Sequence, residues 1–220
     1  MARLVVDAGF REAVRSNGDA ALAGELTSLE RRRLIAIADD RGLDATRMLY
    51  KGFRLSKLYA TLPLTCALLG EKRLGREASL YWAARASVSL YYFEEAFGFC
   101  DHLRAGMKAG LRIMYLDEVL AYERACLELQ RPRSNADSPI NYVIEFQHDP
   151  EVLLNSLVRG KKPRAVPTLK CKVLGQVTKE GEVQWHFIAV TAYPESKQKF
   201  QPANRDHPCL PISSRNDRSS

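Results

Sequence analysis

The chain has 220 residues, of which 46% are hydrophobic, and a formal net charge of +7. This composition excludes a wholly disordered chain, and the length suffices for one large domain or two modest ones, each with a real core. Residues 1–130 hold 19 Lys/Arg against 17 Asp/Glu, whereas residues 131–220 hold 14 against 9. The more basic C-terminal part suits an acidic peptide, a nucleic acid or an acidic protein face, although a merely soluble basic surface explains the same charge.

The first helices are predicted from apolar residues that recur at helical spacing. An amphipathic helix covers about 8–15, and Thr27 with Glu30 forms a capping box for a helix that ends near residue 40. Gly42 is expected in the left-handed conformation that ends this helix. Asp44 is then expected to cap a helix over about 45–61, so that the pair reads as helix, short turn, helix.

Three further helices are expected before residue 131. Pro63 fits the first turn of a short helix ending at Gly70. Longer helices follow over about 76–103 and over about 111–130, and the first of these is either continuous or broken near Gly98. Glu123 lies on the apolar face of the last helix. It is either a functional carboxylate or, as the commoner explanation, a buried acid paired with an arginine.

The apolar period changes from helical to alternating after residue 130. Residues 131–139, with two prolines, read as a linker, and they precede a strand over 140–146 and a helix over 151–158. Strands over 168–178 and 182–192 form a hairpin around 179–181. The sequence therefore predicts an α+β fold: an N-terminal helical bundle (1–130), then a small strand-helix-hairpin domain (140–195) with an open sheet edge, and a flexible tail (196–220).

The open edge of such a small sheet is a place where an extended peptide can add itself as another strand. One side of the first strand, one face of the last strand and the basic loop 160–164 are expected to form a peptide-binding surface. Its residues are Tyr142, Ile144, Phe146, Lys161, Lys162, Arg164, Val183, Trp185 and Phe187. The alternative for the last strand is that two or three of its apolar residues simply pack on the helix over 151–158.

The sequence contains no recognisable catalytic constellation. The HExxH, GxSxG, Walker A and GxGxxG patterns are missing, and the four histidines are scattered. The near pairs Cys100–His102 and His207–Cys209 are interpreted as incidental. We therefore expect no catalytic residue, no metal ligand and no cofactor in this chain, and a stand-alone enzyme is the least favoured class.

Cysteine usage and hydropathy predict the cellular environment. The five cysteines lie far apart, form no CxxC pair and follow no signal peptide, which indicates free thiols in a reducing, cytoplasmic compartment. The longest apolar run, residues 58–70, is shorter than the ~20 residues that a membrane helix needs. No membrane-spanning segment is expected.

A basic stripe is expected on the helix over 45–61, where Arg47, Lys51 and Arg54 recur at helical spacing and Lys57 lies nearby. Such a stripe can follow the phosphates of DNA, as in a helix-turn-helix-like regulator. Against this alternative, the helix offers few side chains that read base edges. The same face can equally meet an acidic partner protein.

Two segments resemble a known helical family. Residues 47–70, RMLYKGFRLSKLYATLPLTCALLG, match its "R…Y…LP…LLG" pattern, and residues 115–125, YLDEVLAYERA, resemble its late helix. The family supplies companion subunits to multinuclear non-haem iron enzymes that modify ribosomally made peptides, of the type found in methanobactin and 3-thiaglutamate biosynthesis. The resemblance covers roughly residues 27–192 and is weaker in the strand-rich half.

The resemblance implies a division of labour. The helical half would dock on a TIM-barrel iron enzyme through Arg47, Lys51, Arg54 and Lys57, and the C-terminal part would engage the leader of a precursor peptide. The iron would belong to the partner. The 3-thiaglutamate branch, in which a C-terminal peptide cysteine loses its β-carbon, is the most similar one.

Overall fold

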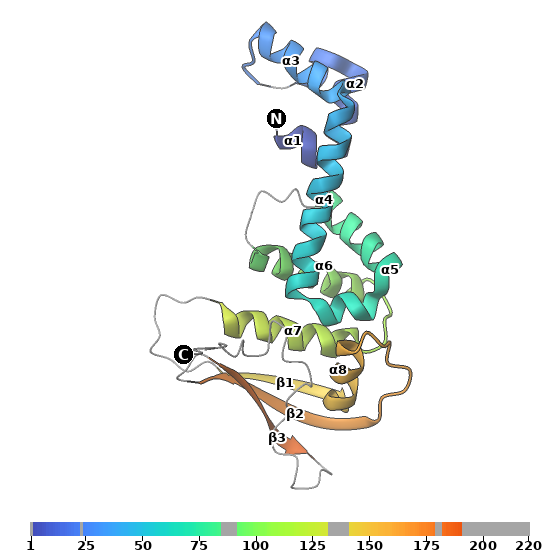
Figure 1. Ribbon diagram of the computed structural model, residues 1–220, viewed down its shortest axis with the longest axis vertical. Helices are drawn as coiled ribbons and strands as arrows, with labels where there is room; N and C mark the ends of the chain where they lie inside the picture. Colours follow the sequence, from blue (N-terminus) through green and yellow to red (C-terminus); the bar gives the residue numbers. More distant parts are fainter. Residues whose placement is uncertain (1, 23, 85–91, 132–140, 179–181, 191–220) are drawn as a thin grey trace, which may run out of the picture.

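The computed structural model describes residues 2–22, 24–84, 92–131, 141–178 and 182–190. The fold is α+β, as predicted: helices come first, and a three-stranded antiparallel sheet follows them (Figure 1). The elements are α1 (Ala2–Val6), α2 (Ala8–Asn17), a 3-10 turn (Gly18–Ala21), α3 (Ser28–Asp39), α4 (Arg41–Thr61), α5 (Pro63–Ala84), α6 (Tyr92–Lys108), α7 (Leu116–Gln130), β1 (Asn141–His148), α8 (Pro150–Val158), β2 (Thr168–Val177) and β3 (Val183–Val190). Within the described residues, no helix combines the length and the apolar character that crossing a membrane requires.

Two hydrophobic cores lie toward opposite ends of the long helix α4 (Figure 1). The smaller one joins α1–α4 and contains Leu4, Val14, Leu22, Ala38 and Leu43. The larger one begins at Leu58 and extends through the later helices into the sheet as far as Trp185. Residues 132–139 of the expected linker lie outside the described residues, but the helices before them and the strands after them share one core. The change of period near residue 130 is therefore a change of secondary structure within a continuous core.

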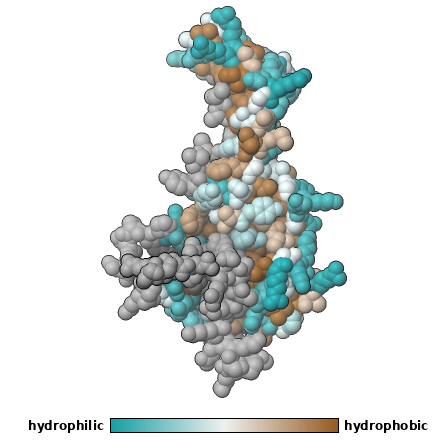
Figure 2. Space-filling view, in the orientation of Figure 1, coloured by the Kyte–Doolittle hydropathy of each residue, from teal (hydrophilic) through white to brown (hydrophobic). Residues whose placement is uncertain are grey.

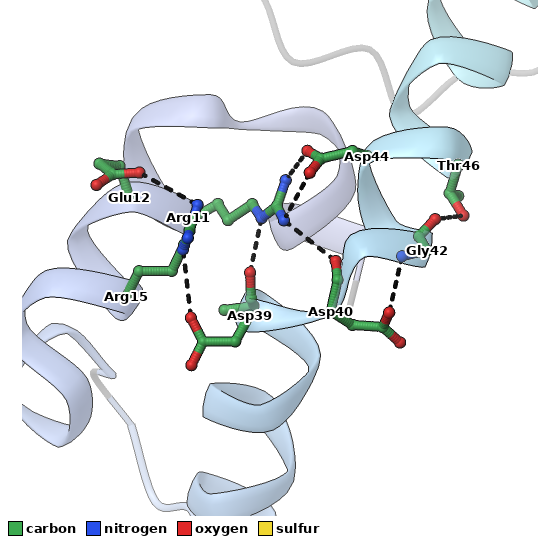
Figure 3. A network of polar contacts seen from close by, with 9 residues as sticks. Arg11, Glu12, Arg15, Asp39, Asp40, Gly42, Asp44 and Thr46 are labelled. Atoms are coloured by element: carbon green, nitrogen blue, oxygen red, sulfur yellow. Dashed lines mark hydrogen bonds and ion pairs between the residues drawn. The ribbon is translucent and has the colours of Figure 1, made fainter.

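A buried arginine fixes α2 to the start of α4 (Figure 3). Arg11 is 4% exposed, and its guanidinium donates to the carbonyls of Ala38, at 2.8 Å, and Asp40, at 3.2 Å, while it pairs with the Asp44 carboxylate. This arginine lowers the pKa of Asp44. The expectation that Asp44 caps α4 is wrong, because the Asp40 side chain does so by accepting the Gly42 N–H at 2.7 Å. Gly42 belongs to the first turn of α4 and does not end α3 in a left-handed conformation.

The middle helices differ from prediction in their bounds. Gly70, with φ 69° and ψ 163°, interrupts α5, so the expected helix from Pro63 to Gly70 is followed directly by a second helical stretch. A single helix over 76–103 is wrong, because the rings of Tyr81 on α5 and Phe99 on α6 lie 5.7 Å apart, which residues 18 positions apart in one straight helix cannot do. Gly98 lies inside α6 without a break. The last helix, α7, begins at 116 instead of 111, because a turn with Tyr115 at φ 65° precedes it.

The sheet has the order β1-β2-β3, and its hairpin is confirmed, although the turn over 179–181 lies outside the described residues. Its apolar face packs on α7, where the rings of Trp185 and Tyr122 lie 5.0 Å apart. Gly175 on β2 makes room for this indole, since a Cβ there would lie 2.4 Å from the Trp185 ring. The helix that covers this face is therefore α7, whereas α8, the expected cover, packs mainly against α5. The tail expected over 196–220 lies outside the described residues.

Candidate functional site

The outer edges of the sheet differ in what occupies them. Along β1, the Glu118 carboxylate of α7 accepts the backbone N–H groups of Gln147 and His148 at 3.0 and 3.1 Å. It also meets the His148 ring, with Glu118 Oε1 2.6 Å from Nδ1. The described part of the chain places no strand against the far side of β3. Both outer strands therefore have an edge without a described partner strand, but Glu118 already accepts two N–H groups at the end of β1, which leaves β3 as the preferred edge for a further strand.

The apolar residues expected to contact a peptide face inward. Ile144, Phe146 and Trp185 are buried in the large core, at 5%, 1% and 3% exposure, so their assignment to a peptide-binding surface is wrong. Tyr142, Val183 and Phe187 are half-buried against the same core. The physical reason is that the period of two fixes which residues share a face but not which face meets the helix.

The opposite face of the sheet carries apolar residues that the sequence reasoning missed. Val143 on β1 and Ile188 on β3 are 54% and 52% exposed. Ile188 lies at a register shift between β2 and β3, where Phe187 and Ala189 pair with consecutive β2 residues. The alternation of burial along β1 contains this signal, because Val143 falls between the half-buried Tyr142 and the buried Ile144. An edge strand with an exposed isoleucine is suited to contact an added peptide.

The basic loop after α8 is exposed, as expected, and it borders a cavity. Lys161, Lys162 and Arg164 are all exposed, and Lys162 with Pro163 forms one wall of a cavity of about 550 Å³. The other walls come from residues 68–73 of α5 and residues 112–115 of the turn before α7. Figure 2 shows hydrophilic side chains projecting on the side of the molecule where α5 and this loop lie in Figure 1.

The cavity is strongly basic. Its lining contains the cations Lys72, Arg73, Arg112 and Lys162 against one carboxylate, that of Glu71. Within the described part of the chain, none of these four cations forms an ion pair. Of this group, the sequence reasoning identified Lys162 alone, because the four cations come together from three separate segments of the chain.

The side chain of Tyr115 connects the cavity with one end of the sheet. Tyr115 lines the cavity, its hydroxyl accepts the Val166 N–H at 3.2 Å, and its ring meets that of His148 at 4.8 Å. His148 is the last residue of β1, and Val166 shortly precedes β2. The cavity therefore lies beside the end of the sheet where β1 finishes and β2 starts.

The basic stripe expected on α4 is divided by burial. Arg47 and Lys51 are half-buried and exposed, respectively, but Arg54 and Lys57 are only 3% and 1% exposed. Arg54 pairs with Glu95 of α6, with Nη2 2.8 Å from Oε1. Placing Arg54 and Lys57 on an exposed partner- or DNA-binding face is therefore wrong, and the DNA-binding alternative loses the C-terminal half of its stripe.

The exposed face of α4 is instead partly apolar, which the charge pattern did not indicate. Met48 and Leu49 are 75% and 76% exposed, and Phe53 is 42% exposed and contacts the ring of Tyr92 at 6.5 Å. Hydrophobic residues are visible on the surface along α4 in Figure 2. Exposed apolar groups beside Arg47 and Lys51 suit a protein partner better than a phosphate backbone.

Glu123 is structural, as the commoner explanation held, but within the described residues its carboxylate is held by backbone N–H groups and not by an arginine ion pair. It is completely buried, and its carboxylate accepts the backbone N–H groups of Leu64 and Thr65 at 2.6 and 2.8 Å, at the start of α5. Burial raises the pKa of Glu123 to about 7, although these hydrogen bonds oppose the shift. Glu123 therefore holds α7 against the start of α5.

Among the described residues, no group of three or more His, Cys, Asp or Glu side chains could hold a metal ion. Cys100 is buried in the core, which leaves the Cys100–His102 pair without an open site. His207 and Cys209 lie outside the described residues. That the iron belongs to a partner stays a prediction.

Comparison with protein-family models, curated proteins and solved structures finds no match to this chain. The described molecule is defined by its fold and its surfaces: an α+β protein with an unpaired sheet edge, a basic cavity beside the sheet and a partly apolar helix face.

Proposed function

We propose that this chain is a non-catalytic adaptor that binds the leader of a ribosomally made precursor peptide as an added strand on β3. The observation that carries the proposal is the outer edge of β3, which no described element pairs with, whereas Glu118 engages the end of β1. An added strand gains backbone hydrogen bonds, and its alternate side chains supply selectivity. The basic charge of this half of the chain favours an acidic leader by steering encounter.

The second half of the proposal concerns a partner enzyme. The exposed apolar residues Met48, Leu49 and Phe53, flanked by Arg47 and Lys51, give α4 a face suited to docking on a protein. The resemblance of residues 47–70 names the partner class: a TIM-barrel multinuclear iron oxygenase that acts on a peptide cysteine. In that arrangement the adaptor raises the effective concentration of the cysteine at the iron site, because leader and enzyme are held on one chain.

The strand-addition step is tested with the full chain and the short Cys-bearing peptide that a precursor gene beside this one would encode. Hydrogen exchange is measured with and without the peptide, and slower exchange is expected over 183–190. Ile188→Lys places a charge on the edge strand and should weaken binding by about tenfold or more. Val143→Lys is the matched control, with similar exposure on the strand whose end Glu118 engages, and it should leave affinity nearly unchanged.

The docking step is tested by co-purification. The tagged chain, produced together with the neighbouring barrel enzyme, should retain it, and Met48→Asp should release it while the charge-matched Ala45→Asp on the same helix does not. Metal analysis should find iron in the complex and no stoichiometric iron in the isolated chain. Peptide modification by the isolated chain, or tight iron binding to it, would contradict the adaptor role.

A further inference from the structure

The basic cavity is a second binding site that the strand-addition role does not use. We infer that it binds an acidic, partly apolar segment of the captured peptide, with an Asp or Glu carboxylate on its cations and a neighbouring aliphatic side chain on its apolar wall. This inference rests on the proposed function, since it assumes a peptide on β3. It assigns the cavity a ligand class and a share in selectivity.

The charge of the lining is the first argument. Lys72, Arg73, Arg112 and Lys162 face a shared space with Glu71 as the one lining carboxylate, and none of these four has an ion-pair partner within the described residues. Like charges gathered around one cavity repel each other, so a ligand carrying negative charge is favoured there. Arginine adds directionality, because its planar guanidinium can donate two parallel hydrogen bonds to one carboxylate.

The shape of the cavity is the second argument. A volume of about 550 Å³ is in the range of small-ligand sites, which hold a few polar groups on a largely apolar lining. Gly70 creates part of this space: a Cβ there would lie 2.9 Å from Lys162 Nζ, and its φ of 69° favours glycine.

The apolar part of the lining favours a peptide carboxylate over a phosphoryl group. Leu68, Ile113 and Met114 line the cavity together with the cations, and Met114 is 66% exposed. A phosphate offers nothing to these side chains, whereas an acidic residue beside a leucine or valine in a peptide contacts both halves of the lining. Burying the aliphatic group on Met114 and its neighbours gives a further gain in free energy.

The position of the cavity relative to β3 is the fourth argument. Val190 pairs with Cys171, and His148 pairs with Thr168, so the last residues of β3 and β1 lie at the same end of the sheet. Tyr115 joins that end to the cavity. A peptide antiparallel to β3 has its N-terminal residues there, about three strand spacings or ~14 Å from β1. About five extended residues span that distance, so one chain can occupy both places.

The experiment is a selection of random 20-residue peptides, displayed on their own messenger RNA, against the immobilised full-length chain. Wild type should enrich peptides with Asp or Glu next to an aliphatic residue, on the N-terminal side of an alternating segment. The bait Arg112→Glu/Lys162→Glu should lose the acidic enrichment and bind the selected peptides about tenfold more weakly or worse. Arg33→Glu/Lys170→Glu changes the net charge equally at exposed residues outside the cavity, and it should retain both properties.

The outcomes separate the inference from the function on which it rests. If the Arg112→Glu/Lys162→Glu bait, called the reversed variant, enriches acidic peptides as well as wild type does, and Ile188→Lys loses binding, the cavity site is overturned and strand addition stands. Failure to enrich any peptide overturns both. A third outcome is that no peptide binds and tripolyphosphate raises the unfolding midpoint of wild type but not of the reversed variant. The ligand of the cavity is then a phosphoryl group and not a peptide carboxylate. If the reversed variant unfolds, Arg112→Gln/Lys162→Gln decides by the same criteria.

Discussion

Replacing Arg54 should destabilise the fold instead of weakening a binding surface. Arg54 and Glu95 are 3% and 2% exposed, and the Glu95 carboxylate also accepts the Trp82 indole N–H at 2.9 Å. Arg54→Met removes the cation, so the Glu95 carboxylate stays buried without its counter-charge and keeps the Trp82 indole N–H as a donor. Breaking a buried pair in this way costs about 3–5 kcal/mol.

The expected result is a large shift in thermal unfolding. For a chain of this size, each kcal/mol shifts the midpoint by about 2–4 °C, so Arg54→Met should lower it by roughly 6–20 °C. The control is Lys51→Met, one turn earlier on the same helix and exposed, which should change the free energy of unfolding by less than about 0.5 kcal/mol.

The pair itself is tested by a double-mutant cycle. Arg54→Met/Glu95→Met removes both charges and leaves the Trp82 N–H without this acceptor, at a cost of about 1–3 kcal/mol. The double variant should therefore be more stable than the sum of the two single variants implies. An unchanged midpoint in Arg54→Met, with weaker binding to a partner or to DNA, would show that Arg54 acts at the surface and would refute the reasoning.

Three further predictions concern the core. Because the pKa of Glu123 rises from 4.5 to about 7 on folding, the unfolding free energy should fall by about 3 kcal/mol as pH rises between these values; denaturant titrations should show that Glu123→Gln removes this fall. Gly175→Ala should cost about 1–3 kcal/mol by contact with Trp185, whereas Gly52→Ala, with open space, should not destabilise. Four buried cysteines, Cys66, Cys100, Cys126 and Cys171, should resist alkylation in the native protein and react in the denatured protein, as peptide mapping of the labelled chain would show.

Burial also controls the reactivity of these thiols. It raises the pKa of Cys100 to about 12 and that of Cys171 to about 11, so the reactive thiolate is scarce at neutral pH. Rapid labelling of either residue in the native protein, at a rate near that of the denatured chain, would contradict the packing of α6 or β2 described above.

The residues predicted to bind a peptide show what a local sequence pattern cannot determine, namely which face of a strand is buried. Alternation correctly grouped Ile144 with Phe146, and Val183 with Trp185, as sharing faces of their strands. It could not tell that this face packs on α7, because that contact joins segments about 60 residues apart, as between Tyr122 and Trp185. Exposed residues on the other face, such as Ile188, are therefore the ones available to a ligand.

The sequence by itself determined the α+β class, the capping box at Thr27 and Glu30, the helix end at Gly70 and the strand hairpin, because each depends on residues near one another in the chain. Only the tertiary structure decided that Arg54 is buried, that Asp44 forms an ion pair with Arg11, and that four cations from three distant segments line one cavity. The physical reason is that periodicity and capping act within a few residues, whereas burial and electrostatic potential depend on which surfaces the folded chain brings together.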